Sequence, residues 1–264
     1  MSCLPKALNL GCVEFAVPGE TLEEKLGVLE SRDMWLELTH DGGRKLEDIL
    51  ASMSSYRTPI KSIQASMLHK LRLLSDDGSE RKDAVRHVEE TMRWASVIGA
   101  KNIVTTLTYG DPASKNPRRM ALEIFKKFGE LAEELSVTVS IEPLGRNRTS
   151  FLPGVSEVFD LVTELGSPHV RLMADTMHIH ENGDDVHDVI ANYVDEISEL
   201  QLRDTDSKPP GLGSIDFAKM MQVVRKKFRG LLCLEYRPGP KPSIDLIQAC
   251  DFIADIIFAD SGSP

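Results

Sequence analysis

Four polar side chains stand at the ends of short apolar runs of the chain. Glu142 follows Val-Thr-Val-Ser-Ile, Asp175 follows Val-Arg-Leu-Met-Ala, Gln201 follows Ile-Ser-Glu-Leu, and Glu235 follows Leu-Leu-Cys-Leu. If these runs are neighbouring strands, three carboxylates meet in one partly dry site, where they repel one another unless a cation neutralises them. Oxygen donors suit a hard or intermediate divalent ion. The set predicts one Mn²⁺ or Mg²⁺ ion, with Co²⁺ and Zn²⁺ as alternatives.

The coordination of such an ion also predicts what else binds there. Four protein oxygens on an octahedral ion leave two positions, enough to chelate neighbouring oxygens of a small hydroxy-carbonyl compound. Any one of these carboxylates taken alone could instead cap a helix or face solvent, as could Asp204, which follows the same run as Gln201. The arrival of all four side chains at one edge favours the metal site.

These side chains require a fold that brings the ends of several strands together. Short β-branched runs predict strands at residues 8–15, 34–38, 60–65, 102–107, 137–141, 170–174, 197–202 and 231–234. Segments with a 3.6-residue apolar period predict helices at residues 22–31, 46–54, 80–98, 117–135, 155–165, 186–193, 217–228 and 244–258. Strict alternation of strands and helices means parallel strands joined by helical crossovers.

The length of the chain and the residues that follow its first strand favour one parallel architecture. The chain has 264 residues, close to the roughly 250 of a (β/α)8 barrel, and no linker divides it. A doubly wound open sheet usually carries a glycine-rich phosphate loop after its first strand, but Phe-Ala-Val-Pro-Gly stands there instead. We therefore predict an α/β fold, a single (β/α)8 TIM barrel over residues 1–264, with its chemistry at the carboxyl ends of the strands.

Composition argues against several classes of protein. The formal net charge is −10 and no concentrated basic stripe interrupts the acidic background, which argues against binding to nucleic acid. No run of eighteen apolar residues could span a membrane, and Met-Ser-Cys-Leu-Pro-Lys at the start lacks the pattern of a secretory signal. Four scattered cysteines fit free thiols in a reducing compartment. The sequence therefore predicts a cytoplasmic protein that binds neither nucleic acid nor membrane.

Five segments follow one another at the spacing of barrel strands. They are EPLGR at 142–146, MADTMH at 173–178, LQLRD at 200–204, PGLGSIDF at 210–217 and LEY at 234–236. They resemble the E-P-x-N-R, D-T-x-H, H/Q-x-x-D and P-G-x-G-x-I-D-F segments and the last strand of the xylose-isomerase-like TIM barrels, the sugar isomerase/epimerase superfamily. The resemblance covers essentially the whole chain.

The resemblance implies a role for each matching position. Glu142, Asp175, Gln201 and Glu235 match the four divalent-metal ligands of the family, with glutamine replacing the commoner histidine as in its hydroxypyruvate-isomerase-like branch. His178 matches a residue that hydrogen-bonds substrate. Glu142 and Glu235 also match the catalytic pair that moves protons on either side of the substrate carbon.

These implied roles are those of an isomerase or epimerase acting on a small sugar, keto acid or sugar phosphate. A metal that bridges a ketone and its neighbouring hydroxyl acidifies the C–H bond between them and stabilises the enediolate that forms. One carboxylate removes the proton and a second group returns it. Return to the other face of the carbon is epimerisation and return to the other carbon is aldose–ketose isomerisation, so we keep both as hypotheses.

Two positions depart from the family pattern and bear on the substrate. Sugar epimerases of the family often read E-P-x-N-R-x-E, whereas this chain has Gly145 for the asparagine and Arg148 for the last glutamate. A guanidinium binds carboxylate or phosphate bidentately, so Arg148 favours an anionic hydroxy-carbonyl substrate. Further residues expected to bind substrate at the pocket are Lys208, Arg237, Glu37 and His69.

Three other functions stay open on the same barrel. A dehydratase begins with the same proton abstraction and differs in what leaves next. A protein that binds a sugar acid without turnover would use the same pocket. An endonuclease-IV-like DNA repair enzyme shares the fold but needs a trinuclear zinc site with several histidines at strand ends, which this sequence does not offer. The resemblance also implies a homo-oligomer, since such barrels often form dimers or tetramers.

Overall fold

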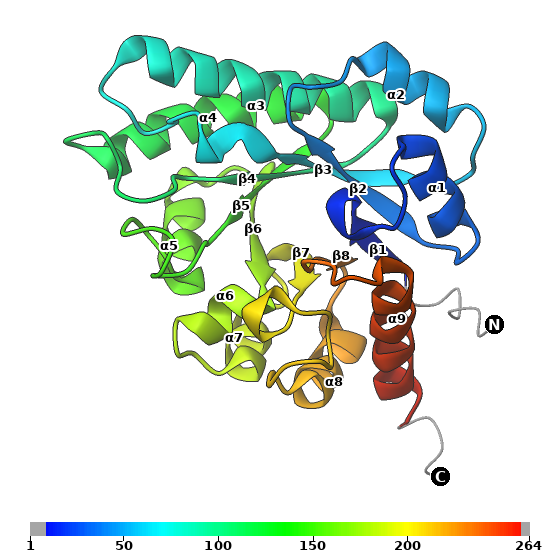
Figure 1. Ribbon diagram of the computed structural model, residues 1–264. Helices are drawn as coiled ribbons and strands as arrows, with labels where there is room; N and C mark the ends of the chain where they lie inside the picture. Colours follow the sequence, from blue (N-terminus) through cyan, green and yellow to red (C-terminus); the bar gives the residue numbers. More distant parts are fainter. Residues whose placement is uncertain (1–8, 260–264) are drawn as a thin grey trace.

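The computed structural model describes residues 9–259, so Leu8 of the first predicted strand and both ends of the predicted domain lie outside the described residues. The strands are β1 (Leu10–Val13), β2 (Trp35–His40), β3 (Ile60–Ala65), β4 (Asn102–Thr106), β5 (Thr138–Glu142), β6 (Val170–Asp175), β7 (Ile197–Leu202) and β8 (Leu231–Leu234). The α-helices are α1 (Leu22–Glu30), α2 (Leu46–Met53), α3 (Gly78–Ile98), α4 (Pro117–Leu135), α5 (Val155–Leu165), α6 (Thr176–Glu181), α7 (Val186–Tyr193), α8 (Phe217–Lys227) and α9 (Pro242–Ala259) (Figure 1).

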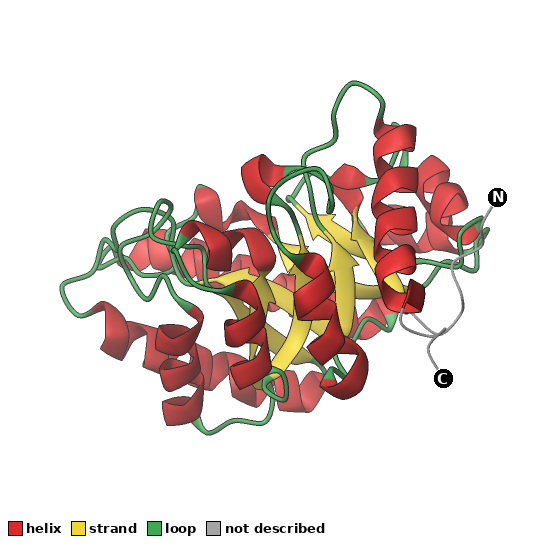
Figure 2. Cartoon of the chain, turned by 90° about the horizontal axis from the view of Figure 1, so that it is seen from below, coloured by secondary structure: helices red, strands yellow, loops and turns green. Residues whose placement is uncertain are grey.

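These strands close into a parallel barrel. β1 pairs with β2 on one side and with β8 on the other, so the described sheet has no free edge. Figure 2 shows the strands at the centre of the molecule with the helices around them. Parallel neighbours need a crossover, and the helices between successive strands supply it. The prediction of a (β/α)8 TIM barrel is confirmed.

Local sequence accounts for where the crossover helices begin and end. The Asp77 side chain caps α3, because its Oδ1 accepts hydrogen bonds from the backbone N–H groups of Ser79 and Glu80. Gly99 ends the same helix with a φ of 90°, a left-handed conformation that glycine adopts without steric penalty. Pro117 stands in the first turn of α4, where a backbone N–H is not needed. β4 and β5 therefore begin within one residue of their predicted positions.

Close packing joins the first two strands to each other. The indole of Trp35 lies against Gly11 of β1, where a Cβ atom would come within 2.2 Å of the ring. Its Nε1 donates a hydrogen bond to the backbone oxygen of Asn9 at 2.7 Å. In the helix layer, the rings of Phe125 and Phe128 of α4 meet edge to face with centroids 5.3 Å apart.

No helix among residues 9–259 has the length and apolar character needed to cross a membrane.

Short helical turns follow several strands and were not predicted. They are α6 and the 3₁₀ turns Glu14–Ala16, Ser66–His69 and Thr205–Ser207. The turn Glu14–Ala16 ends β1 at Val13, two residues before the predicted end, because the Glu14 side chain is held by its neighbours. Its carboxylate pairs with Arg44 at 2.6 Å and accepts the backbone N–H of Thr39 at 3.1 Å. Each turn redirects the chain at the carboxyl end of a strand, where the predicted site lies.

Candidate active site

The four side chains predicted to bind metal come from four consecutive strands and lie at the same end of the barrel. Glu142 and Asp175 are the last residues of β5 and β6, Gln201 lies in β7, and Glu235 directly follows β8. The register pairs Asp175 with Gln201 across β6 and β7. All four are at most 5% exposed. We call this cluster of side chains the barrel mouth.

Asp175 both ends β6 and begins the helix that follows. Its Oδ1 accepts the backbone N–H groups of Met177 at 2.8 Å and His178 at 3.1 Å, which makes it the N-cap of α6. The helix brings His178 to the barrel mouth, where its Nε2 lies 3.6 Å from Oε1 of Glu142. Burial lowers the pKa of His178 to about 4, so the imidazole is neutral at neutral pH.

Arg203, which was not among the predicted site residues, completes the barrel mouth. The side chain is buried, and its Nη1 lies 3.0 Å from Oε1 of Glu235. Its Nη2 forms a short hydrogen bond to Oδ2 of Asp175 and lies 3.2 Å from Nε2 of His178. A guanidinium can only donate, so Nε2 of His178 accepts. The imidazole proton then sits on Nδ1, 3.6 Å from Oε2 of Glu181.

The period of a strand is the signal that would have identified Arg203. Side chains alternate between the two faces of a strand, so residues two apart face the same way. Glu199, Gln201 and Arg203 are spaced by two, and all three are buried in polar surroundings. Extending the alternation by one step beyond Gln201 places a cation among the predicted carboxylates.

Burial and neighbouring charge give the carboxyl groups different pKa values. Burial, followed by the charges of Glu235 and Asp175, raises the pKa of Glu142 well above its usual range. Burial also raises the pKa of Glu235, to about 7, although the Arg203 guanidinium opposes that rise. Burial acts on Asp175 too, but there the guanidinium and its hydrogen bond help to bring the pKa below its usual value. The barrel mouth therefore combines a permanent carboxylate with two carboxyl groups able to hold a proton.

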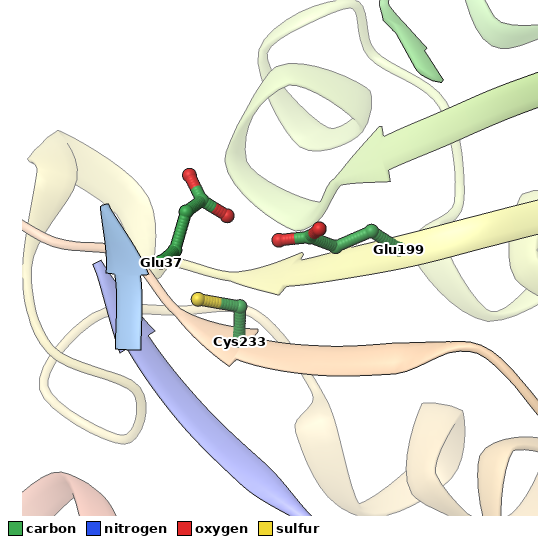
Figure 3. A group of neighbouring side chains, drawn as sticks. All are labelled: Glu37, Glu199 and Cys233. Atoms are coloured by element: carbon green, nitrogen blue, oxygen red, sulfur yellow. The ribbon is translucent and has the colours of Figure 1, made fainter. Parts of the chain in front are cut away.

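A second polar layer lies beneath the barrel mouth, inside the barrel. Nε2 of Gln201 donates to both carboxylate oxygens of Glu37, at 3.0 and 3.3 Å. Figure 3 shows Glu199 and Cys233 pointing toward Glu37, and one ligand atom of each lies within 4.8 Å of the others. Burial, then the Glu199 charge, raises the pKa of Glu37 well above its usual range. Glu37, which was predicted to bind substrate, contacts the predicted ligand Gln201 and is fully buried away from solvent.

The donor atoms of the barrel mouth fit a divalent cation. Oε1 of Gln201 and Oε2 of Glu235 are buried and have no hydrogen-bond partner among the described residues, although buried polar atoms normally have one. Glu142, Asp175 and His178 each offer a ligand atom within 4.8 Å of the others. Because its amide nitrogen is held from below, Gln201 has its carbonyl oxygen left for a ligand. This oxygen-rich set suits Mn²⁺ or Mg²⁺.

Arg148 is a predicted substrate-binding cation whose charge acts on groups of the barrel mouth. It is half-buried in the loop after β5, and its backbone oxygen accepts the N–H of Gly110 at 2.7 Å. Its positive charge opposes the burial-driven rise in the pKa of both Glu142 and Glu235. The structure therefore places this guanidinium within electrostatic reach of both predicted catalytic carboxyl groups.

Three other predicted pocket residues, Lys208, Arg237 and His69, are exposed. Lys208 pairs at 3.0 Å with Asp206, its neighbour in the loop after β7. Arg237 follows β8, and its contact with that loop runs through the backbone, whose N–H donates to Ser207. His69 lies at the end of a 3₁₀ turn and meets the ring of Tyr109 edge-on, with centroids 6.3 Å apart. Within residues 9–259, none of these three side chains forms a hydrogen bond or ion pair with the predicted ligands.

Asp204 anchors a loop rather than facing the barrel mouth. Its two carboxylate oxygens accept the backbone N–H groups of Thr205 at 2.8 Å, Gly211 at 3.0 Å, Gly213 at 2.9 Å and Ile215 at 3.1 Å. A carboxylate with four such donors has no lone pair left for a metal. The alternative considered for this residue, a capping role, therefore matches its contacts.

Comparison with known proteins gives one family and several relatives. The chain is 30% identical over 119 residues to a D-psicose 3-epimerase of Enterocloster bolteae, an alignment that covers 45% of this chain and 40% of that protein. It is 29% identical over 141 residues to a putative hydroxypyruvate isomerase of Streptomyces coelicolor, covering 50% of each. The aligned region thus spans about half the length of these curated relatives.

A solved structure with low sequence identity shares the fold. The IOLI protein with a binding zinc atom superposes with a TM-score of 0.76 at 13% identity, covering 96% of this chain and 98% of that one. A model of the family described as xylose isomerase-like TIM barrel matches residues 7–255, nearly the whole described range. This chain therefore belongs to the xylose isomerase-like TIM barrel family.

Proposed function

We propose that the chain is a divalent-metal-dependent isomerase or epimerase that moves a proton at a carbon next to a carbonyl group. The observation that carries this proposal is the pair Glu142 and Glu235, two buried carboxyl groups with raised pKa values beside the low-pKa carboxylate of Asp175. The names of the relatives, an epimerase and a putative isomerase, support the same class of chemistry.

Glu142, Asp175, Gln201 and Glu235 would hold the metal. When bound, the cation would polarise the carbonyl and neighbouring hydroxyl of the substrate and so acidify the C–H bond between them. The protein's own part is to orient these donors before the substrate arrives. The N-terminal N–H groups of α6 fix Asp175, and Glu37 fixes the amide of Gln201.

Proton transfer falls to the two glutamates. A carboxyl group with a pKa near 7 can take a proton from carbon and return one at neutral pH without a large free-energy difference between its two states. Burial raises the pKa of Glu235 to about 7 and also raises that of Glu142, and a bound divalent cation would lower both pKa values. The neutral imidazole of His178, next to Glu142, would accept a hydrogen bond from a substrate hydroxyl through Nε2. One glutamate would remove the proton and the other would return it.

We further propose that the substrate is a small sugar, keto acid or sugar phosphate that carries an anionic group. Arg148 supports this, because its guanidinium lies within electrostatic reach of both glutamates and forms no ion pair with any described residue. A neutral sugar would give that cation no counter-charge, whereas a carboxylate or phosphate accepts its hydrogen bonds bidentately.

Exchange of substrate hydrogen with solvent deuterium tests the proposal. The full chain would be incubated in D₂O with Mn²⁺, Mg²⁺ or Co²⁺ and a panel of keto acids, keto sugars and their phosphates. We expect deuterium at one carbon next to a carbonyl, together with an epimer or isomer of equal mass apart from the label. A product that has lost water would instead indicate a dehydratase. If compounds bind but none of them exchanges hydrogen with the solvent in the presence of any of the three metals, the isomerase proposal is refuted.

Arg148→Glu tests the anionic substrate separately. We expect KM to rise at least tenfold for the exchanging compound, with kcat changed less, because the variant loses an attractive charge and gains a repulsive one. Arg146→Glu, two residues earlier and exposed, makes the same change in charge and serves as the control. Equal effects of the two variants would show that Arg148 does not contact the substrate.

A further inference from the structure

Arg203 contacts the same carboxylates that the proposed metal needs. Its two terminal nitrogens divide between Asp175 and Glu235, two of the four predicted ligands, and the side chain is 8% exposed. Among residues 9–259, this is the only guanidinium that forms an ion pair with any of those ligands. The barrel mouth thus already contains a cation supplied by the chain itself.

The oxygen atoms of Asp175 show where the two cations would compete. Oδ1 already accepts two backbone N–H groups of α6, and Oδ2 accepts Nη2 of Arg203. A metal ligated by Asp175 must therefore share or take Oδ2, which brings it next to the guanidinium. Two cations on one buried oxygen repel each other strongly where the dielectric is low. Glu235 presents no such conflict, because Arg203 holds Oε1 while Oε2 has no partner among the described residues.

Formal charge shows that the guanidinium and the metal can nevertheless reside in one site. Three carboxylates and one guanidinium leave a formal charge of −2, which a single divalent cation would balance. Arg203 need not leave the barrel mouth when the metal enters. It is enough that the guanidinium releases Oδ2 of Asp175 and keeps its contact with Oε1 of Glu235. Nη2 is then free beside Nε2 of His178.

We propose that Arg203 is a built-in competitor that occupies the cation position of the barrel mouth, sets its affinity for divalent metal, and turns Nη2 toward the substrate once metal displaces it from Asp175. This proposal rests on the proposed function. Nη2, once released, would be a donor for a substrate oxygen, beside Nε2 of His178, which can only accept. Arg203 therefore couples the two binding events: metal binding exposes a substrate-binding group that is otherwise held by a metal ligand.

Direct metal binding by the full chain tests the proposal without measuring activity. Calorimetric titration with Mn²⁺ would compare the wild type, Arg203→Met, Arg203→Lys and the control Arg118→Met. Arg118 pairs with Glu164 on the surface, so its loss removes one charge far from the barrel mouth. Loss of a competing charge-assisted hydrogen bond predicts Mn²⁺ affinity at least tenfold higher for Arg203→Met, an intermediate value for Arg203→Lys, and a change within twofold for Arg118→Met.

Thermal unfolding with and without Mn²⁺ gives a second readout. Arg203→Met leaves buried carboxylates without their cation, so we expect a lower Tm without metal and a larger rise in Tm on adding Mn²⁺ than for the wild type. If the variant folds only when Mn²⁺ is present, that requirement supports the proposal as well. Mn²⁺ affinity of Arg203→Met equal to or below that of the wild type would overturn it. Failure of Mn²⁺, Mg²⁺ and Co²⁺ to bind either protein would instead overturn the metal-dependent function itself.

Discussion

The substitution Asp204→Asn tests how the loop over the carboxyl end of β7 is held. The carboxylate accepts Thr205 and Ile215 through Oδ1, and Gly211 and Gly213 through Oδ2. Asparagine has the same size, but its NH₂ group can only donate. One of these two pairs of backbone N–H groups must therefore lose its acceptor and face another donor.

The surroundings of the two pairs decide the magnitude. Ile215 is buried, whereas Gly211 and Gly213 are exposed and can reach water. The amide will therefore keep its oxygen on Thr205 and Ile215 and turn its NH₂ toward the two glycines. A donor left without its acceptor destabilises the fold by about 1–3 kcal/mol, and access to water places each glycine near the lower limit. We expect a loss of about 2 kcal/mol.

Urea unfolding of the full chain measures this loss, and limited proteolysis locates it. We expect faster cleavage within residues 205–215 in Asp204→Asn than in the wild type. Asp206→Asn is the matched control, because it makes the same chemical change at an exposed residue that pairs with Lys208. Surface substitutions of this kind change stability by at most about 0.5 kcal/mol. A difference between the two variants below that value, with equal cleavage, would refute the idea that the Asp204 carboxylate anchors the loop.

Three further predictions address catalysis, acid stability and packing. Glu142→Gln and Glu235→Gln should each lower kcat by about 10²–10⁴-fold with the fold retained, because an amide cannot carry the transferred proton; deuterium exchange at wild-type rates would contradict this. Burial lowers the pKa of His40 to about 4 in the folded state, against about 6.5 in the unfolded chain. Its contribution to stability is therefore fully present above pH 6.5 and is lost as the pH falls toward 4, up to about 3 kcal/mol. Urea unfolding at pH values from 7.5 to 4.5 should show that His40→Gln loses less free energy of unfolding on acidification than the wild type does. Equal losses in the two proteins would contradict the role given to His40. Gly11→Ala should destabilise by about 1–3 kcal/mol in urea, since its Cβ would overlap the indole beside it, whereas Gly78→Ala has room and should change stability far less.

The carboxylates of the barrel mouth were predictable because they depend only on local pattern. Glu142, Asp175 and Glu235 each end an apolar run, and in a parallel barrel every such end reaches the same rim. No register between strands is needed for that conclusion. The eight strands and the long helices were predictable for the same reason, since their periods lie within single segments.

Features that depend on contacts between distant segments could not be predicted in this way. The orientation of the Gln201 amide is set by Glu37, 164 residues away in the sequence. The inward orientation of Arg203 follows from the alternation along β7. Its ion pairs with Asp175 and Glu235 depend on residues at the ends of other strands. The six-residue helix α6 is too short to show a helical period, so its effect on His178 emerges only from the structure.

The alternation along β7 also bears on how the chain finds its fold. Glu199 and Gln201 face polar partners inside the barrel, while Leu200 and Leu202, which alternate with them along the strand, are buried in the core. A slip of one residue against β6 would exchange the two sets and leave a carboxyl group and an amide in apolar surroundings without their partners. The pairing of β6 with β7 contains one irregularity of register, between Leu172 and Met173. The groups proposed to serve the reaction therefore also discriminate against misaligned barrels, and replacing them together with apolar residues would remove both properties at once.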